Sequence, residues 1–262
     1  MKRSISNIGW AAENDTQVYA LMKNYGFQGL EIAPTRIFPE LPYDKNAEAE
    51  EWSRNIKNEY GFSVPSMQSI WYGRQEKIFG SDEERKALLE YTKKAIDFAA
   101  AIGCKNLVFG CPRNRNIPEG ADENIAVTFF KELGDYACSK GTVIGVEANP
   151  PIYNTNYIND TKSALELIEK VDSKGFLLNL DLGTMVHNEE EINELAGKVR
   201  LINHVHISEP GLKPIEERRL HAELKELLMK EGYNRFVSIE MGKVDDISIL
   251  EDKMAYVRRI FA

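Results

Sequence analysis

Cysteine is scarce in this sequence, which contains only Cys104, Cys111 and Cys138. No two of them form a CxxC pair, and their odd number argues against a disulfide framework. No apolar run approaches the roughly 20 residues that a membrane-spanning helix needs. Residues 1–17 include basic side chains but no apolar stretch of signal-peptide length. We therefore expect a cytoplasmic protein without disulfides and without a membrane partner.

Positive charge is also in short supply, because 33 Lys and Arg face 41 Asp and Glu, giving a formal net charge of −8. Binding to nucleic acid depends on basic side chains that neutralise phosphates, so this balance argues against a nucleic-acid partner. The one basic cluster, residues 113–115 (RNR), is too small to follow a duplex, although it could hold one small anion. No GxGxxG motif follows an early strand, so the dinucleotide-binding fingerprint is absent.

Short apolar runs alternate with longer amphipathic stretches from one end of the chain to the other. The longer stretches repeat apolar residues near the helical period of 3.6, and we predict helices at 82–103, 161–171, 190–199 and 218–232 among others. Strand–helix alternation with short connections implies parallel strands joined by right-handed crossovers. We predict an α/β fold, a single (β/α)8 TIM barrel domain over residues 1–262. Its eight strands are expected at 4–10, 29–34, 63–70, 106–110, 142–147, 176–181, 201–206 and 237–240.

A polar residue ends each of the last four predicted strands: Glu147, Asp181, His206 and Glu240. Active sites of such barrels lie where the strands end. Any one of these residues alone would more often cap a helix or join an ion pair. Each interval between them, however, accommodates one helix, one strand and two loops. The four side chains are therefore expected at the same height on neighbouring strands.

Three carboxylates brought together in this way would repel one another and be driven towards protonation unless a cation neutralised them. We therefore predict that Glu147, Asp181, His206 and Glu240 bind one divalent metal ion. A set of three oxygen ligands and one imidazole suits Mn²⁺, Mg²⁺, Co²⁺ or Zn²⁺.

Three further polar residues lie two positions before a predicted ligand: Asn179, His204 and Ser238. Strand alternation points them inward, one level deeper in the barrel. We expect His204 to orient the ligands from behind. For Asn179 and Ser238, the same role and simple filling of a polar interior both remain open.

Candidate substrate-binding residues end predicted strands or lie in the loops that follow them. An aromatic ring there would offer an apolar face to a sugar, and arginines would bind a phosphate or carboxylate. The alternatives are an aromatic that packs a loop, a solvated charge cluster and, for the one histidine of the set, an exposed loop. The candidates are Glu31, Gln68, Trp71, Arg113, Arg115 and His187.

Four stretches together resemble the xylose-isomerase-like TIM-barrel superfamily of sugar isomerases and epimerases: TVIGVEANP, FLLNLDLGTM, NHVHISE and residues 221–241. In motif layout they are most similar to ketose 3-epimerases and related sugar phosphate isomerase/epimerase proteins. The resemblance covers the whole chain, since GFQGLEI and AIDFAAAIGCKNLVFG are also typical of the early strands. It implies that Glu147 and Glu240 are both metal ligands and the acid/base pair, with Asp181 and His206 completing the metal site.

The reaction implied is proton transfer at a carbon next to a carbonyl. One glutamate removes a proton, the other returns one, and the metal stabilises the enediolate. The substrate positions depart from the ketose 3-epimerase pattern, because Thr184 replaces a histidine, Leu212 an arginine and Tyr153 a glutamate. The orthodox pocket for a free ketose is therefore not conserved in this chain.

We accordingly predict a metal-dependent isomerase or epimerase acting on a sugar or sugar phosphate as its small-molecule partner. Two alternatives remain open: a dehydratase of a cyclic polyol ketone, and a non-catalytic barrel that binds metal and sugar. Endonuclease IV-like activity is disfavoured, since it needs a histidine-rich zinc cluster and a basic face. Barrels of this kind often form homodimers, although no sequence feature marks an interface.

Overall fold

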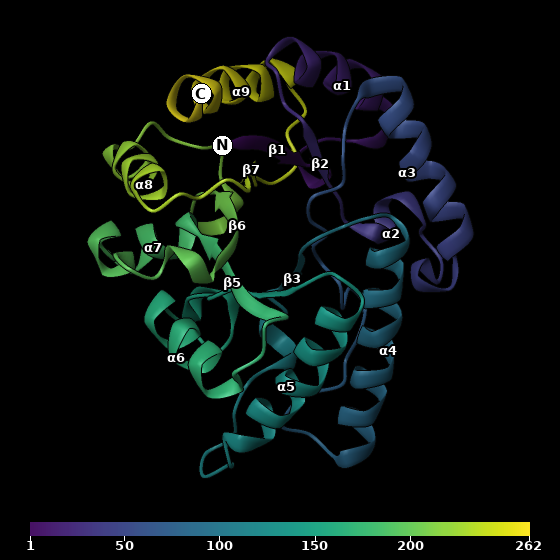
Figure 1. Cartoon of the computed structure of the whole chain (residues 1–262), viewed down its shortest axis with the longest axis vertical. Helices are drawn as coiled ribbons and strands as arrows, with labels where there is room; N and C mark the ends of the chain where they lie inside the picture. The colour runs from purple at the N-terminus through teal and green to yellow at the C-terminus, as the bar shows by residue number, and fades with distance from the viewer.

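Seven parallel strands form a curved sheet in the computed structural model, which describes residues 1–262. The strand order is β2-β1-β7-β6-β5-β4-β3, so strands from the two ends of the chain pair near one end of the sheet. The strands enclose a central space, and the helices lie around the outside (Figure 1). The strands are β1 (Lys2–Ser6), β2 (Gly29–Glu31), β3 (Leu107–Phe109), β4 (Ile144–Val146), β5 (Phe176–Asp181), β6 (Ile202–Ile207) and β7 (Phe236–Ile239).

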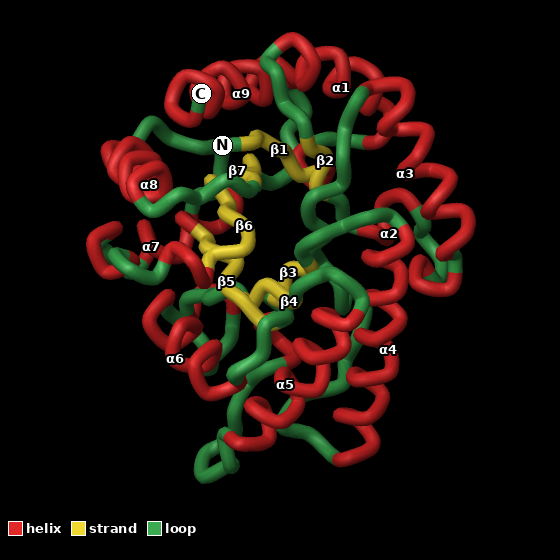
Figure 2. The backbone as a smooth tube through the Cα atoms, viewed as in Figure 1, coloured by secondary structure: helices red, strands yellow, loops and turns green.

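The segment around Met67 takes the place of the eighth strand, between β2 and β3, and is drawn as loop in Figure 2. Met67 bridges to Ile32 on one side and Leu107 on the other, and its N–H donates to Asn106 O at 2.9 Å. These bridges close the ring, which confirms the TIM-barrel fold. The strand predicted at 63–70 is nevertheless wrong as a continuous strand, because its pairing is limited to isolated bridges. Pro65 within it has no N–H to donate.

The helices occupy the connections between strands, as the alternating pattern predicts, and α4, α6 and α8 match the expected stretches. The helix predicted at 190–199 is wrong. Two short 3-10 turns, Ile192–Leu195 and Val199–Leu201, replace it, with Gly197 between them in the left-handed region at φ 77°. No helix is both long and apolar enough to cross a bilayer. The helices are α1 (Asp15–Asn24), α2 (Pro34–Ile37), α3 (Asn46–Tyr60), α4 (Asp82–Ala101), α5 (Asn124–Ser139), α6 (Thr161–Val171), α7 (Leu182–His187), α8 (Arg219–Lys230) and α9 (Ile247–Phe261).

The two sides of the sheet differ in character. Outward-facing side chains meet the helices in an apolar core, where for example the rings of Phe130 on α5 and Phe176 on β5 stack 4.9 Å apart. The inside of the barrel is polar: Asn106 donates to Asn179 Oδ1 at 3.2 Å and accepts from Asn203 at 2.9 Å. This buried hydrogen-bonded layer lies beneath the strand ends and supports the side chains there.

Stability is expected to fall as the pH drops below 6.5, because of His221 on α8. The side chain is fully buried with Nδ1 2.8 Å from the Tyr256 hydroxyl, and burial lowers its pKa to about 4. Between that value and the ordinary pKa of about 6.5, the unfolded chain binds more protons than the folded one. The contribution is therefore complete above pH 6.5 and is lost as the pH falls towards 4.

Chemical denaturation at pH 7 and pH 4.5 would measure this effect. The wild type is expected to lose about 2–3 kcal/mol more free energy of unfolding than His221→Gln over this interval. Comparing the change in free energy of unfolding between the two pH values, rather than its absolute value, removes the cost of the substitution itself. An equal loss in both proteins would contradict the prediction.

Candidate metal and sugar site

The four predicted ligands converge at one end of the barrel. Glu147 directly follows β4, Asp181 ends β5, His206 is in β6 and Glu240 directly follows β7. In the β5–β6 pairing, Asp181 is opposite His206, which puts both at the same height. One ligand atom from each of the four side chains lies within 4.8 Å of the others. The structure thus brings together a set that is widely spread along the sequence.

His206 is at the centre of this group. Its Nδ1 lies 3.1 Å from Glu147 Oε2 and 3.1 Å from Glu240 Oε2, while its Nε2 faces Glu31 on the other side. Burial disfavours the charged imidazole, but Glu240 and Glu31 outweigh it and hold the pKa of His206 well above the ordinary value. The environment at this position therefore favours positive charge.

The carboxylates around His206 repel one another. Burial, with a further contribution from Glu147, raises the pKa of Asp181 to about 6. Burial likewise raises the pKa of Glu240 to about 7 in spite of the nearby His206. Three closely spaced carboxylates, of which Asp181 and Glu240 have raised pKa values, are the electrostatic signature of a cation site. The donor set and its electrostatics both fit one divalent ion.

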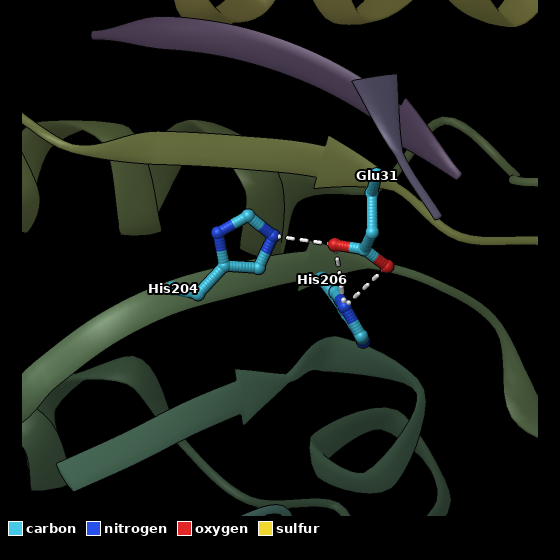
Figure 3. A group of neighbouring side chains, drawn as sticks. All are labelled: Glu31, His204 and His206. Carbon is cyan, nitrogen blue, oxygen red and sulfur yellow. Dashed lines mark hydrogen bonds and ion pairs between the residues drawn. The ribbon is translucent and has the colours of Figure 1, made fainter. Parts of the chain in front are cut away.

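A second buried group lies behind His206 and is shown in Figure 3. Glu31 Oε2 is 2.7 Å from His204 Nε2, and Glu31 Oε1 is 3.1 Å from His206 Nε2. Gln68 donates to Glu31 Oε1 at 3.0 Å and to Ser6 Oγ at 2.6 Å. By occupying Nε2 of His206, Glu31 leaves Nδ1 facing the three carboxylates.

This arrangement shows which contacts three predicted site residues make: Glu31, Gln68 and His204. Glu31, a candidate for contact with substrate, is fully buried beneath the predicted ligands. Gln68 contacts Glu31 and also lines the pocket that Glu147, Asp181 and Glu240 line. His204 bonds Glu31 and so acts on His206 through it. Glu31, His204 and His206 also form a second group with possible metal-donor atoms, but none of them lines the pocket.

Both oxygens of Glu147 are fixed by side-chain amides. Asn149 donates to Oε1 at 2.9 Å, and Asn179 donates to Oε2 at 2.9 Å. Asn179 thus positions a ligand, while the buried hydroxyl of Ser238 has no hydrogen-bond partner. Sequence reasoning missed Asn149, although its position two residues after Glu147 is a usable signal.

Arg115 supports the same glutamate from behind. Its guanidinium donates to Glu147 O at 2.8 Å, to Asn149 Oδ1 at 3.1 Å and to Ile158 O at 3.1 Å. The side chain is fully buried, and burial lowers its pKa to about 10, so it remains charged at neutral pH. Arg115, predicted to contact substrate, is therefore placed where it holds the loop that carries Glu147 and Asn149.

Asp181 is held by the start of α7 and by a serine that the sequence did not single out. Its Oδ1 accepts the N–H of Thr184 at 2.6 Å, as the N-cap of that helix, and its Oδ2 accepts from the Ser208 hydroxyl. The N-cap role and the predicted metal-ligand role both require a carboxylate oxygen at this strand end. One residue supplies both.

Three of the four predicted ligands, Glu147, Asp181 and Glu240, line a pocket of about 160 Å³. A further acid in its wall, Glu209, was missed from the sequence. It forms a bidentate ion pair with Arg218, at 2.7 Å to Nε and 2.6 Å to Nη2. That pair fixes the loop after β6. The pocket is also lined by Ser69, Gly110, Cys111, Pro112, Tyr153 and Leu212.

Comparison with known proteins places this architecture in a family. Residues 19–260 match the family model described as xylose isomerase-like TIM barrel. The chain belongs to this family. A search of curated proteins finds no match.

Solved structures share the xylose isomerase-like fold over nearly the whole chain. The 3-keto-D-glucoside 4-epimerase of E. coli superposes with a TM-score of 0.77 at 20% identity, covering 99% of each chain. The D-psicose 3-epimerase of Clostridium cellulolyticum H10 gives 0.77 at 17% identity, covering 100% of this chain and 99% of that one. A family 2 AP endonuclease of Brucella melitensis gives 0.74 at 19% identity, covering 99% of each.

Within this xylose isomerase-like barrel, the positions that depart from the ketose 3-epimerase pattern lie in or near the pocket. Tyr153 and Leu212 line it, and the Tyr153 hydroxyl accepts the N–H of Gly211 at 2.8 Å. Thr184 is buried behind the wall, where its hydroxyl donates to Ala148 O at 2.8 Å. The substitutions at Tyr153 and Leu212 therefore change the surface of the pocket, whereas the one at Thr184 does not.

The remaining predicted substrate residues are not brought into this pocket. Trp71 is 3% exposed, its Nε1 donates to Thr92 at 2.8 Å, and its ring packs edge-on against Phe109. His187 is exposed at the last position of α7 and does not line the pocket. Arg113 lies in the loop after β3, in a neighbouring compartment.

Proposed function

We propose that the protein is a divalent-metal-dependent isomerase or epimerase acting on a sugar or sugar phosphate. The observation that carries this proposal is the placement of Glu147 and Glu240. Both end in the pocket from strands on either side of Asp181 and His206, and both come within 3.1 Å of the same imidazole nitrogen. Two carboxylates in one small pocket can remove a proton from a substrate carbon and return one.

The two glutamates differ in a way that suits paired acid and base roles. The pKa of Glu240 is raised to about 7, close to the pH at which a side chain both gives and takes protons efficiently. Glu147 is held by two amide donors, Asn149 and Asn179, that fix the direction of both its oxygens. We assign the proton transfers to this pair without fixing which of them acts first.

Glu147, Asp181, His206 and Glu240 would hold the ion. When bound, a divalent ion supplies positive charge that stabilises the negative charge developing on the substrate oxygen as the neighbouring proton leaves. Glu31 keeps Nδ1 of His206 directed towards the site, and Asn149, Asn179 and Ser208 hold the carboxylates. The protein thereby provides a preorganised set of donors.

The names of two similar structures agree with this proposal, since one is a 3-keto-D-glucoside 4-epimerase and the other a D-psicose 3-epimerase. The AP endonuclease neighbour is not favoured as a guide. Net charge is −8, and the pocket wall carries four acids, Glu147, Asp181, Glu209 and Glu240, but no cation. Such a wall repels a phosphate backbone.

Proton exchange with solvent tests the proposal. Protein loaded with Mn²⁺ is incubated in D₂O with ketoses, aldoses and their phosphates, and deuterium at the carbon next to the carbonyl is followed by NMR. We expect labelling of at least one sugar that EDTA abolishes and added Mn²⁺ restores. Failure to label any sugar by metal-loaded protein would overturn the proposal and favour a dehydratase or a binding protein.

A further inference from the structure

A second compartment, of about 620 Å³, opens beside the site pocket. Its walls are the segment after Met67 and the loop after β3. Ser69, Cys111 and Pro112 line both spaces, so the two adjoin. Tyr72, with 73% of its side chain exposed, stands in the wall of the larger one. The compartment therefore lies directly beside the candidate metal site.

The charge of the second compartment is opposite to that of the site pocket. Its charged lining residues are Arg74, Lys77 and Arg113, with no acid among them. This reversal occurs in a chain where acids outnumber bases by 41 to 33. Arg74 is neutralised by an ion pair with Glu76 and lies over the ring of Tyr91. Lys77 and Arg113 are exposed and have no ion-pair partner, so two positive charges are available to a ligand.

The walls that carry these cations are connected to each other. Asn114 donates to Arg74 O at 3.2 Å and to Glu76 O at 2.7 Å, and the N–H of Ile78 donates back to Asn114 O at 2.9 Å. Non-glycine residues adopt the left-handed region at the start of both loops, Ser69 at φ 55° and Cys111 at φ 43°. Such conformations cost roughly 1–3 kcal/mol and gather at ligand sites. The compartment is thus built by two mutually fixed loops.

We infer that this compartment binds an anionic group of the substrate, a phosphate ester or a carboxylate, while the reacting carbons lie at Glu147 and Glu240. The inference rests on the proposed function and names the class of sugar on which the site acts. Arg113 and Lys77 are the residues that recognise the anion. Guanidinium and ammonium groups bind phosphate and carboxylate through charge-assisted hydrogen bonds.

The test compares anionic sugars with their neutral parent in the D₂O assay, using D-fructose 6-phosphate, D-fructuronate and D-fructose. One variant carries Lys77→Gln with Arg113→Gln. The control carries Arg54→Gln with Lys162→Gln, which removes the same charge from two exposed helix positions. Isothermal titration of the same sugars to metal-loaded protein gives a readout that does not need turnover.

We expect at least one anionic sugar to be labelled with a kcat/KM about 10-fold to 100-fold above that of D-fructose. The Lys77/Arg113 variant is expected to lose this preference through a higher KM for the anionic sugar, while kcat and the kcat/KM for D-fructose change little. The control variant is expected to retain the preference. Whichever anion is preferred identifies phosphate or carboxylate as the recognised group.

Two outcomes separate this inference from the proposed function. Labelling of D-fructose as good as that of both anionic sugars would overturn the anion compartment and leave the isomerase proposal standing. Tight binding of an anionic sugar that is lost in the Lys77/Arg113 variant, without labelling of any sugar, would support the compartment and overturn the chemistry. Equal binding of all three sugars in both variants would overturn the compartment.

Discussion

Replacing Glu240 with glutamine is expected to slow deuterium exchange into the substrate by about 10²–10⁴-fold, the usual range for loss of a general acid or base. Glutamine has the shape of glutamate but cannot accept a proton in this pH range. The side chain is 9% exposed and lines the pocket, where an amide of the same size fits without disturbing the barrel. Circular dichroism and the denaturation midpoint would verify that the variant folds.

The same substitution also removes one metal donor, so metal affinity must be measured together with the rate. We would titrate Mn²⁺ by electron paramagnetic resonance and compare rates at saturating metal. Glu147→Gln is expected to behave similarly, because both glutamates are assigned proton transfers. Glu217→Gln, an exposed residue paired with Arg259, is the matched control. Full activity of a metal-saturated Glu240→Gln would refute the assignment.

The convergence of the four candidate metal ligands could be predicted from sequence, because each of them lies at the end of a strand. A polar residue that ends an apolar strand is visible in a short window, and the βα repeat fixes where that strand end lies. Glu147, Asp181, His206 and Glu240 therefore needed only the fold and their spacing. His204 followed from strand alternation relative to His206, since both belong to one strand.

The remaining roles depend on contacts between distant segments, which no local pattern records. Arg115 and Arg113 are two residues apart in one basic cluster, yet one is fully buried beneath Glu147 and the other lies in an open compartment. Trp71 reads as a loop aromatic but packs against Phe109 in the core. Glu31 meets His206 from the opposite part of the chain. Such pairings arise only when the ring closes.

The same reasoning explains the two incorrect elements. The apolar pattern at 63–70 indicated a strand correctly in position, but Pro65 restricted its pairing to isolated bridges. The pattern at 190–199 suited a helix except for Gly197, and a left-handed conformation there breaks the element into two turns. The hydrophobic pattern thus predicted where the elements occur. How regular each element is was decided by a single residue, Pro65, which has no N–H, or Gly197, which has no side chain.

Replacing Arg115 with methionine is expected to reduce the free energy of unfolding by about 3 kcal/mol. Methionine fills much of the same apolar space but removes the guanidinium donors to Glu147 O and Asn149 Oδ1, while Ile158 O keeps the N–H of Asn149 at 3.0 Å. Buried acceptors that lose their partners cost about 1–3 kcal/mol each. Part of this cost is offset because the substitution also removes the desolvation cost of a buried guanidinium. Urea denaturation would measure the change, with Arg200→Met as an exposed control.

The effect on Mn²⁺ affinity tests whether Arg115 positions Glu147 or only stabilises the fold. Asn149 loses its bond to Arg115 and with it a fixed orientation towards Glu147 Oε1, so Mn²⁺ affinity is expected to fall about 10-fold to 100-fold. Arg115→Lys keeps the charge but cannot present donors to three separated acceptors, and should recover only part of both losses. If Arg115→Met lowered stability while Mn²⁺ affinity in the folded protein stayed unchanged, Arg115 would support the loop without positioning Glu147.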